Sequence, residues 1–116
     1  MVALDPDVKR RALATAHALA REAPLCAAYL FGSHAEGRAH QWSDIDVAVF
    51  IKGLESWDLS RKTRLIVQIQ KEVGFDVEPH LFPASWHENP PRASFAQYIL
   101  KHGVPLDIEG IQPQAA

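Results

Sequence analysis

Two carboxylates at alternate positions are the most chemically informative residues of this sequence. Asp44 and Asp46 flank Ile45 at the start of an apolar run, and alternate residues of a strand point to the same face of a sheet. Two like charges held side by side repel each other, and a divalent cation between them relieves that repulsion. Alone, such a pair is better interpreted as ordinary turn and strand-start residues; together with the glycine-serine turn upstream, it predicts a metal site at one end of a strand.

A glycine-serine turn precedes these aspartates along the chain. Gly32 and Ser33 provide small backbone with hydrogen-bond donors that can approach a phosphate, and Gly37 also allows close approach. Arg38 could offset phosphate charge, and Ser43 could hydrogen-bond a phosphate or cap the start of the strand. These five residues are the candidate nucleotide-binding residues. Together with the aspartates they predict a site for phosphate and a divalent metal.

A third carboxylate is expected on another strand. Two Mg²⁺ ions about 3.5–4 Å apart can activate an attacking oxygen and stabilise a leaving one, with at least two bridging carboxylates and commonly a third. Asp76 and Glu78 are the acidic residues of the expected strand 75–82, and both share a face with His80. The residue pattern leaves open which of the two completes the site.

The elements that carry these residues follow from helix caps and hydrophobic spacing. Asp5 and Pro6 begin a helix that Pro24 ends, and Asp58 begins a second helix that ends before Gly74. The remaining elements are strands over 25–31, 44–51, 75–82 and 104–108, and a last short helix over 93–101. Because the first two strands are joined too tightly for a crossover helix, the expected fold class is α/β, with a mixed β-sheet and helices packed on it.

Three side chains beside these elements are expected to be apolar packing residues. Leu59 falls on the apolar stripe of the second helix, and Phe75 shares the apolar face of its strand with Val77. Cys26 lies in an apolar stretch and is expected to pack as a small hydrophobic residue. A single thiol cannot form an internal bridge, which fits a reducing cytoplasm.

Length and composition predict one soluble globular domain over 1–108, followed by a frayed tail over 109–116. The chain has 116 residues, of which 47% are hydrophobic and 22% charged. Its formal charge of −2 argues against general nucleic-acid binding. No apolar run approaches the ~20 residues of a membrane span, and no signal peptide is visible at the N-terminus. A cytoplasmic protein without a membrane partner is expected.

The motif of the first third of the chain resembles that of the polymerase-β-like nucleotidyltransferase superfamily. The matching positions are Gly32-Ser33, Ala35, Gly37 and Ser43-Asp44-Ile45-Asp46, with the apolar strand that follows. More narrowly, the chain resembles the minimal nucleotidyltransferases (MNT) of bacterial and archaeal HEPN/MNT toxin–antitoxin pairs, loosely through 76–80 and 99–103. His34 stands where such proteins often carry Arg, and the segment 76–78 offers two acids where the family uses one.

This resemblance implies a metal-dependent enzyme that transfers a nucleoside monophosphate, AMP from ATP, to a hydroxyl. Asp44, Asp46 and Glu78 would hold two Mg²⁺ ions; Glu78 is preferred as third carboxylate because it lies centrally in its strand, and Asp76 is the alternative. Either acid could serve as base toward the acceptor. The implied partner is a helical HEPN toxin modified on a tyrosine, with this chain as its antitoxin.

Two other functions remain open at this point. The chain could be a non-catalytic antitoxin module that covers its partner and keeps only a vestigial nucleotide site. It could instead modify a small molecule such as an aminoglycoside, which is less favoured because no acceptor-binding segment is visible. The sequence also leaves open which nucleotide is used and whether the chain forms a homo-oligomer.

Overall fold

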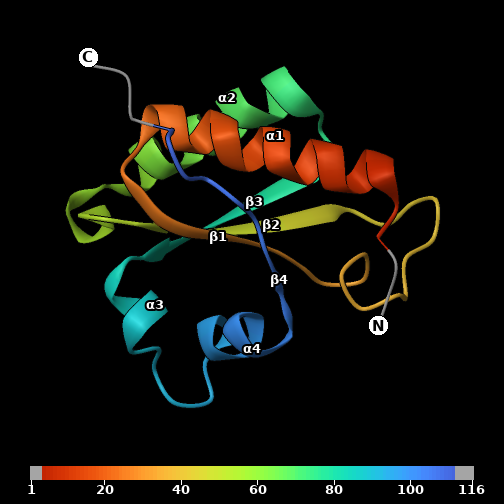
Figure 1. Ribbon diagram of the computed structural model, residues 1–116. Coiled ribbons are helices and arrows are strands. Elements are labelled where there is room, and N and C mark those ends of the chain that lie inside the picture. The colour runs from red at the N-terminus through yellow and green to blue at the C-terminus, as the bar shows by residue number, and fades with distance from the viewer. Residues whose placement is uncertain (1–3, 112–116) are drawn as a thin grey trace.

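The computed structural model describes residues 4–111, which form one sheet between two layers of helices (Figure 1). The strands are β1 (Leu25–Phe31), β2 (Ile45–Ile51), β3 (Val77–Pro83) and β4 (Val104–Pro105). The helices are α1 (Pro6–Glu22), α2 (Leu59–Val73), α3 (Ser85–Glu88) and α4 (Phe95–His102), with a 3₁₀ turn η1 (Leu54–Ser56). None of the helices within 4–111 combines the length and the apolar character needed to cross a bilayer. Residues 112–116 of the expected tail lie outside the described residues.

The sheet is mixed, in the order β3-β2-β1-β4. β1 is antiparallel to β2 and to β4, whereas β2 is parallel to β3. The connection between β1 and β2 contains no helix, whereas the parallel pair β2 and β3 is joined by the crossover that contains α2. The expected α/β class with a mixed sheet is confirmed.

The two long helices begin at the predicted caps. The Asp5 side chain accepts a hydrogen bond from the Asp7 amide at 2.8 Å, and Asp58 accepts one from the Arg61 amide at 2.8 Å. Each cap satisfies a backbone N–H that has no partner within its helix. α1 ends at Glu22, before the predicted break at Pro24.

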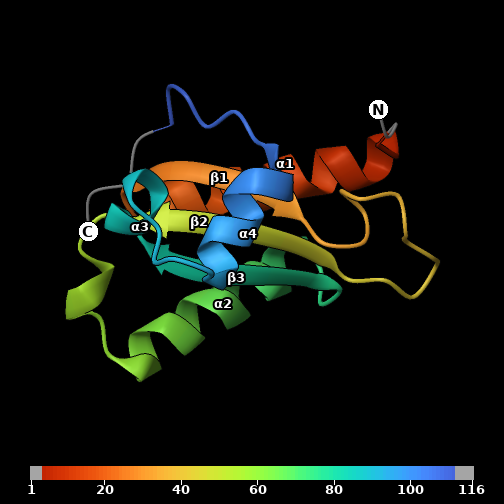
Figure 2. The ribbon, with the colours of Figure 1, turned by 90° about the horizontal axis from the view of Figure 1, so that it is seen from below.

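The sheet is apolar on both faces along most of its length. α1 and α2 cover one face and α4 crosses the other, as Figure 2 shows from below. The larger core lies between the sheet and the first pair of helices, with Leu19, Leu30, Val47, Val49 and Ile69 among its fully buried side chains. The smaller core under α4 contains Phe31, Ala48 and Ile99. On this second face Asp46, Glu78 and His80 form a polar region toward the N-terminal ends of β2 and β3.

Two residues expected in apolar stripes are exposed. Leu59 is 78% exposed because it is the first residue of α2, and the buried residues of that helix are Leu65 and Ile69 instead. Phe75 is 71% exposed because it lies in the turn 74–77 that precedes β3, not in the strand itself.

Cys26 is also exposed, contrary to the prediction that it packs as a small hydrophobic residue. The pairing of β1 with β2 shifts register between Leu25 and Ala27, so Cys26 is an unpaired residue at an irregularity of the strand. Such a bulge re-aims the side chain of the extra residue.

The last strand is shorter than the expected 104–108 and contains only Val104 and Pro105.

Candidate active site

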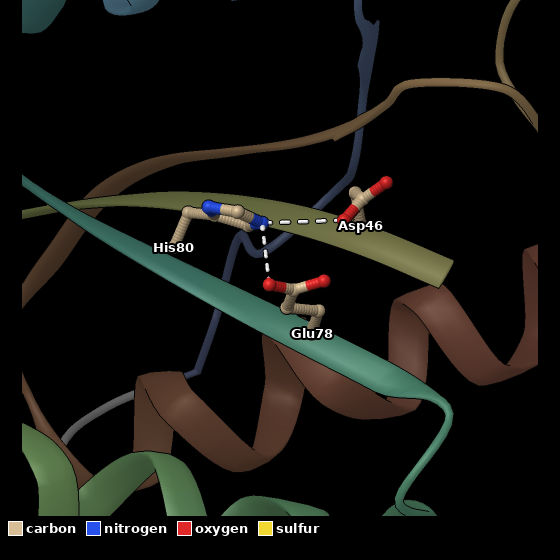
Figure 3. Close-up of side chains that lie close together, drawn as sticks. All are labelled: Asp46, Glu78 and His80. Carbon is tan, nitrogen blue, oxygen red and sulfur yellow. Dashed lines mark hydrogen bonds and ion pairs between the residues drawn. The ribbon is translucent and has the colours of Figure 1, made fainter. Parts of the chain in front are cut away.

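Asp46 and Glu78 lie directly opposite each other on neighbouring strands. The parallel register of β2 and β3 pairs Asp46 with Glu78. His80 follows two residues later and points to the same face. Its Nε2 lies 3.2 Å from Asp46 Oδ1 and 4.0 Å from Glu78 Oε1 (Figure 3). We call these three residues the carboxylate–histidine cluster, in which one ligand atom from each side chain lies within 4.8 Å of the others.

The glycine-serine turn packs directly against this cluster. Gly32 has a φ of +81°, and a Cβ added at Gly32 would lie 2.6 Å from Asp46 Oδ2. The turn then closes by hydrogen bonds from the Glu36 amide to Gly32 O at 3.0 Å and from the Arg38 amide to Ser33 O at 2.9 Å. This position favours glycine, because the positive φ and the neighbouring Asp46 carboxylate both disfavour a side chain.

We expect Gly32→Ala to weaken both stability and function. The left-handed φ costs a non-glycine residue about 1–2 kcal/mol, and the added methyl must also displace the Asp46 carboxylate. Urea unfolding should show a loss of at least about 1 kcal/mol, and metal binding should weaken as well. Gly53→Ala is the matched control, because Gly53 has a φ of +78° but nothing within 4 Å of its added Cβ. Equal metal affinity in the two variants would contradict the packing of Gly32 on Asp46.

Asp44 lies one residue before β2 and is exposed. The strand begins at the next residue, Ile45, so Asp44 stands immediately before it. Asp44 is outside the carboxylate–histidine cluster. Its carboxylate makes no hydrogen bond or ion pair with the rest of residues 4–111, so it is free to bind a ligand at this end of the strand.

Asp76 is paired with Arg11 of α1, on the helix that covers the opposite face of the sheet from α4. Its carboxylate receives two hydrogen bonds from the Arg11 guanidinium of α1, one of them at 2.7 Å from Nη1 to Oδ2. These hydrogen bonds and the positive charge lower the pKa of Asp76 below its ordinary value. Of the two candidate third carboxylates, the structure brings Glu78 to Asp46 and pairs Asp76 with Arg11.

The Arg11–Asp76 pair predicts an acid-sensitive contribution to stability. A carboxyl group whose pKa is lowered in the folded state stabilises it above the ordinary pKa of about 4 and loses that effect as pH falls. We expect Asp76→Asn to lower the free energy of unfolding at pH 7 by at most about 1 kcal/mol, because the carboxylate is half exposed. Denaturant unfolding between pH 7 and 3 should show the difference shrinking in acid. A constant difference across that range would contradict the assignment.

Three of the candidate nucleotide-binding residues point away from the cluster or are engaged elsewhere. Gly37 and Ser43 line a hollow of about 510 Å³ between this loop and α1, which contains neither Asp46 nor Glu78 in its lining. Ser43 Oγ accepts a hydrogen bond from the His40 amide at 2.9 Å. Arg38 forms an ion pair with Glu36 at 3.2 Å. Of the five, Gly32 and Ser33 are the residues of the turn beside the cluster.

The turn also contacts α4, and the sequence did not predict this contact. The Tyr98 hydroxyl lies 2.9 Å from both carboxylate oxygens of Glu36. This hydrogen bond lowers the pKa of Glu36, which stays ionised beside the turn. It joins residues 62 positions apart, and no local pattern signals such a pairing. The contact connects α4 to the turn that carries Ser33.

Comparison with known proteins identifies the family to which this domain belongs. A family model described as "Polymerase beta, Nucleotidyltransferase" matches residues 15–106. The chain belongs to the polymerase β nucleotidyltransferase family. The superfamily resemblance noted in the sequence is therefore confirmed, and the cluster lies in a nucleotidyltransferase domain.

The nucleotidyltransferase fold is also found among solved structures. A crystal structure of a presumed nucleotidyltransferase from Sulfolobus solfataricus superposes with a TM-score of 0.57 at 18% sequence identity. The match covers 85% of this chain and 82% of that chain, and it supports the fold alone. No curated protein matches this nucleotidyltransferase chain.

The donor atoms at the site of this nucleotidyltransferase fit a divalent cation. Carboxylate oxygens from Asp46 and Glu78 converge from adjacent strands, which is the ligand type that Mg²⁺ takes together with substrate phosphates. Asp46 is largely covered, with 21% of its side chain exposed, whereas Glu78 is 52% exposed. The Asp46 side of the site is therefore largely covered by protein, and the Glu78 side is accessible to solvent.

Proposed function

We propose that this domain is a magnesium-dependent nucleotidyltransferase that transfers AMP from ATP to a hydroxyl group. The observation that carries the proposal is the register pairing of Asp46 with Glu78 beside the Gly32-Ser33 turn. Family membership supports the transfer of a nucleotide in general. The metal, the nucleotide and the acceptor are the parts proposed here.

Each residue of the site has a role in this reaction. Asp46 and Glu78 would hold the metal, with Asp44 as the free carboxylate at the same end of β2. Backbone donors of Gly32 and Ser33 bind the terminal phosphates. Magnesium bound there would supply positive charge that offsets the charge of the phosphates and of the leaving pyrophosphate.

We also assign Glu78 the role of the base. Its side chain is half exposed at the open side of the site, where an acceptor hydroxyl would approach. The acceptor oxygen forms a bond to the α-phosphorus of ATP as the bond from that phosphorus to the β-phosphate bridge breaks. The acceptor proton passes to Glu78, and pyrophosphate leaves.

We further propose that the acceptor is a tyrosine of a helical HEPN-type toxin, with this chain as its cytoplasmic antitoxin. The proposal depends on the motif resemblance to minimal nucleotidyltransferases. It is supported by exposed aromatic side chains of α4 beside the cluster, where Phe95 is 51% exposed with its ring centroid 6.0 Å from that of His80. An acceptor protein that reaches the cluster would contact this part of α4.

The test is a labelling reaction with the protein encoded by the neighbouring gene. Purified chain, Mg²⁺ and partner are incubated with ATP that carries ³²P at the α- or at the γ-phosphate. Transfer of AMP labels the partner from α-labelled ATP only, and tyrosine should be the labelled residue by mass spectrometry. Label from γ-labelled ATP would show phosphorylation instead, and no label with an intact complex would favour a non-catalytic antitoxin.

That second function, a partner-covering module with a vestigial nucleotide site, is favoured by one observation. Asp44 lies outside the carboxylate–histidine cluster, so the described conformation does not bring three acids together. If this function is correct, the chain neutralises its partner equally well with and without ATP.

A further inference from the structure

We propose that His80 is a ligand of the catalytic metal and that this site binds a divalent transition-metal ion, Mn²⁺, more tightly than Mg²⁺. The inference rests on the metal use in the proposed function, but it concerns which ion is held and by which atoms. It adds a nitrogen donor to a site that the motif alone describes as carboxylate only.

The positions of the donor atoms carry this inference. His80 Nε2 lies 3.2 Å from Asp46 Oδ1 and 4.0 Å from Glu78 Oε1, so the imidazole nitrogen is aimed between the two carboxylates (Figure 3). Atoms that bind one ion at about 2.1 Å lie roughly 3–4.2 Å apart. Both distances from His80 fall within that range, and the ligand atoms of all three side chains lie within 4.8 Å of one another, as expected of side chains that can close on a single ion.

The neighbours of His80 favour a ligand role over a surface role. The imidazole is held edge-on by Phe31, with ring centroids 4.9 Å apart, and by Phe95 at 6.0 Å. Only a quarter of its side chain is exposed. A ring fixed in this way already directs Nε2 at the carboxylates. The His80 side chain therefore loses little further conformational entropy when an ion binds.

The donor set determines which ion is preferred. Carboxylate and water ligands suit both Mg²⁺ and Mn²⁺, whereas an imidazole nitrogen adds affinity for transition metals and little for Mg²⁺. One nitrogen and two carboxylate oxygens from this chain leave further positions for water or substrate phosphate. The site is therefore expected to discriminate in favour of Mn²⁺.

The experiment measures metal binding without nucleotide transfer. Mn²⁺ is titrated into the full chain and followed by electron paramagnetic resonance, with Mg²⁺ as competitor, and electron spin-echo modulation reports any ¹⁴N bound to the ion. His80→Phe removes the nitrogen donor but retains a ring against Phe31 and Phe95. His87→Phe is the matched control, because His87 packs on Phe50 of the same sheet face outside the cluster.

We expect imidazole ¹⁴N modulation in the wild type and in His87→Phe, and none in His80→Phe. The affinity for Mn²⁺ should fall about tenfold or more in His80→Phe, while the affinity for Mg²⁺ changes little. Should His80→Phe fail to fold by circular dichroism, His80→Asn provides the same comparison. Persistence of the ¹⁴N signal without His80, its absence from the wild type, or an equal loss of both ions would overturn the inference.

The two proposals fail in different ways. A chain that binds Mn²⁺ through His80 but labels no acceptor with either ion contradicts the proposed transfer and leaves the ligand assignment standing. A chain that transfers AMP with Mg²⁺ and shows no ¹⁴N modulation contradicts only the role of His80.

Discussion

Replacing Asp44 and Asp46 together by Asn should abolish nucleotidyl transfer and leave the fold intact. The substitutions retain side-chain size but remove the negative charges that hold the metal and its phosphates. We expect the transfer rate to fall to about one-thousandth of the wild-type rate or less. The measurement is the initial rate of α-labelled ATP transfer to the acceptor, with circular dichroism and thermal unfolding on the same preparation.

The single variants separate the contributions of the two aspartates. Asp46 contacts His80 and packs on Gly32, whereas Asp44 is exposed and makes no ion pair in the described residues. Asp46→Asn alone should therefore remove nearly all metal binding. A control that changes Glu55 and Glu109 to Gln removes the same charge from exposed positions away from the cluster. Substantial transfer by the double aspartate variant would refute the metal-dependent mechanism.

Glu78→Gln should lower transfer by about 100-fold or more, because it removes a metal ligand and the base at once. The structure supplies its own matched control in Asp76, which lies two residues earlier on the same segment but is paired with Arg11. Asp76→Asn should keep most of the transfer activity. The two variants are compared by transfer rate at equal folded concentration.

The reverse result would identify Asp76 as the third carboxylate. Loss of transfer in Asp76→Asn with activity retained in Glu78→Gln would mean that Asp76 leaves Arg11 when substrate binds. A cluster of Asp46 and Glu78 would then be a feature of the free protein only.

Local signals in the sequence were sufficient for most of the fold. The caps at Asp5 and Asp58 begin helices because their side chains satisfy amides of the first turn. The connection from β1 to β2 has no room for a full crossover helix, which favours an antiparallel pair and predicted the mixed sheet. Exceptions include Leu59, Phe75 and Cys26, whose exposure depends on where a helix or strand begins and on a shift in register.

The residue types and spacing of the motif also indicated the chemistry of the site, because a glycine-serine turn ahead of closely spaced carboxylates suits phosphate and a divalent cation. The sequence did not distinguish the surroundings of Asp76 from those of Glu78, and these became visible only in the tertiary structure. The register of β2 and β3 places Glu78 opposite Asp46. Asp76 pairs instead with Arg11 of α1, which lies 65 residues earlier in the chain. Such contacts between distant segments follow from how the strands align and the helices pack, and the local order of residues does not encode them.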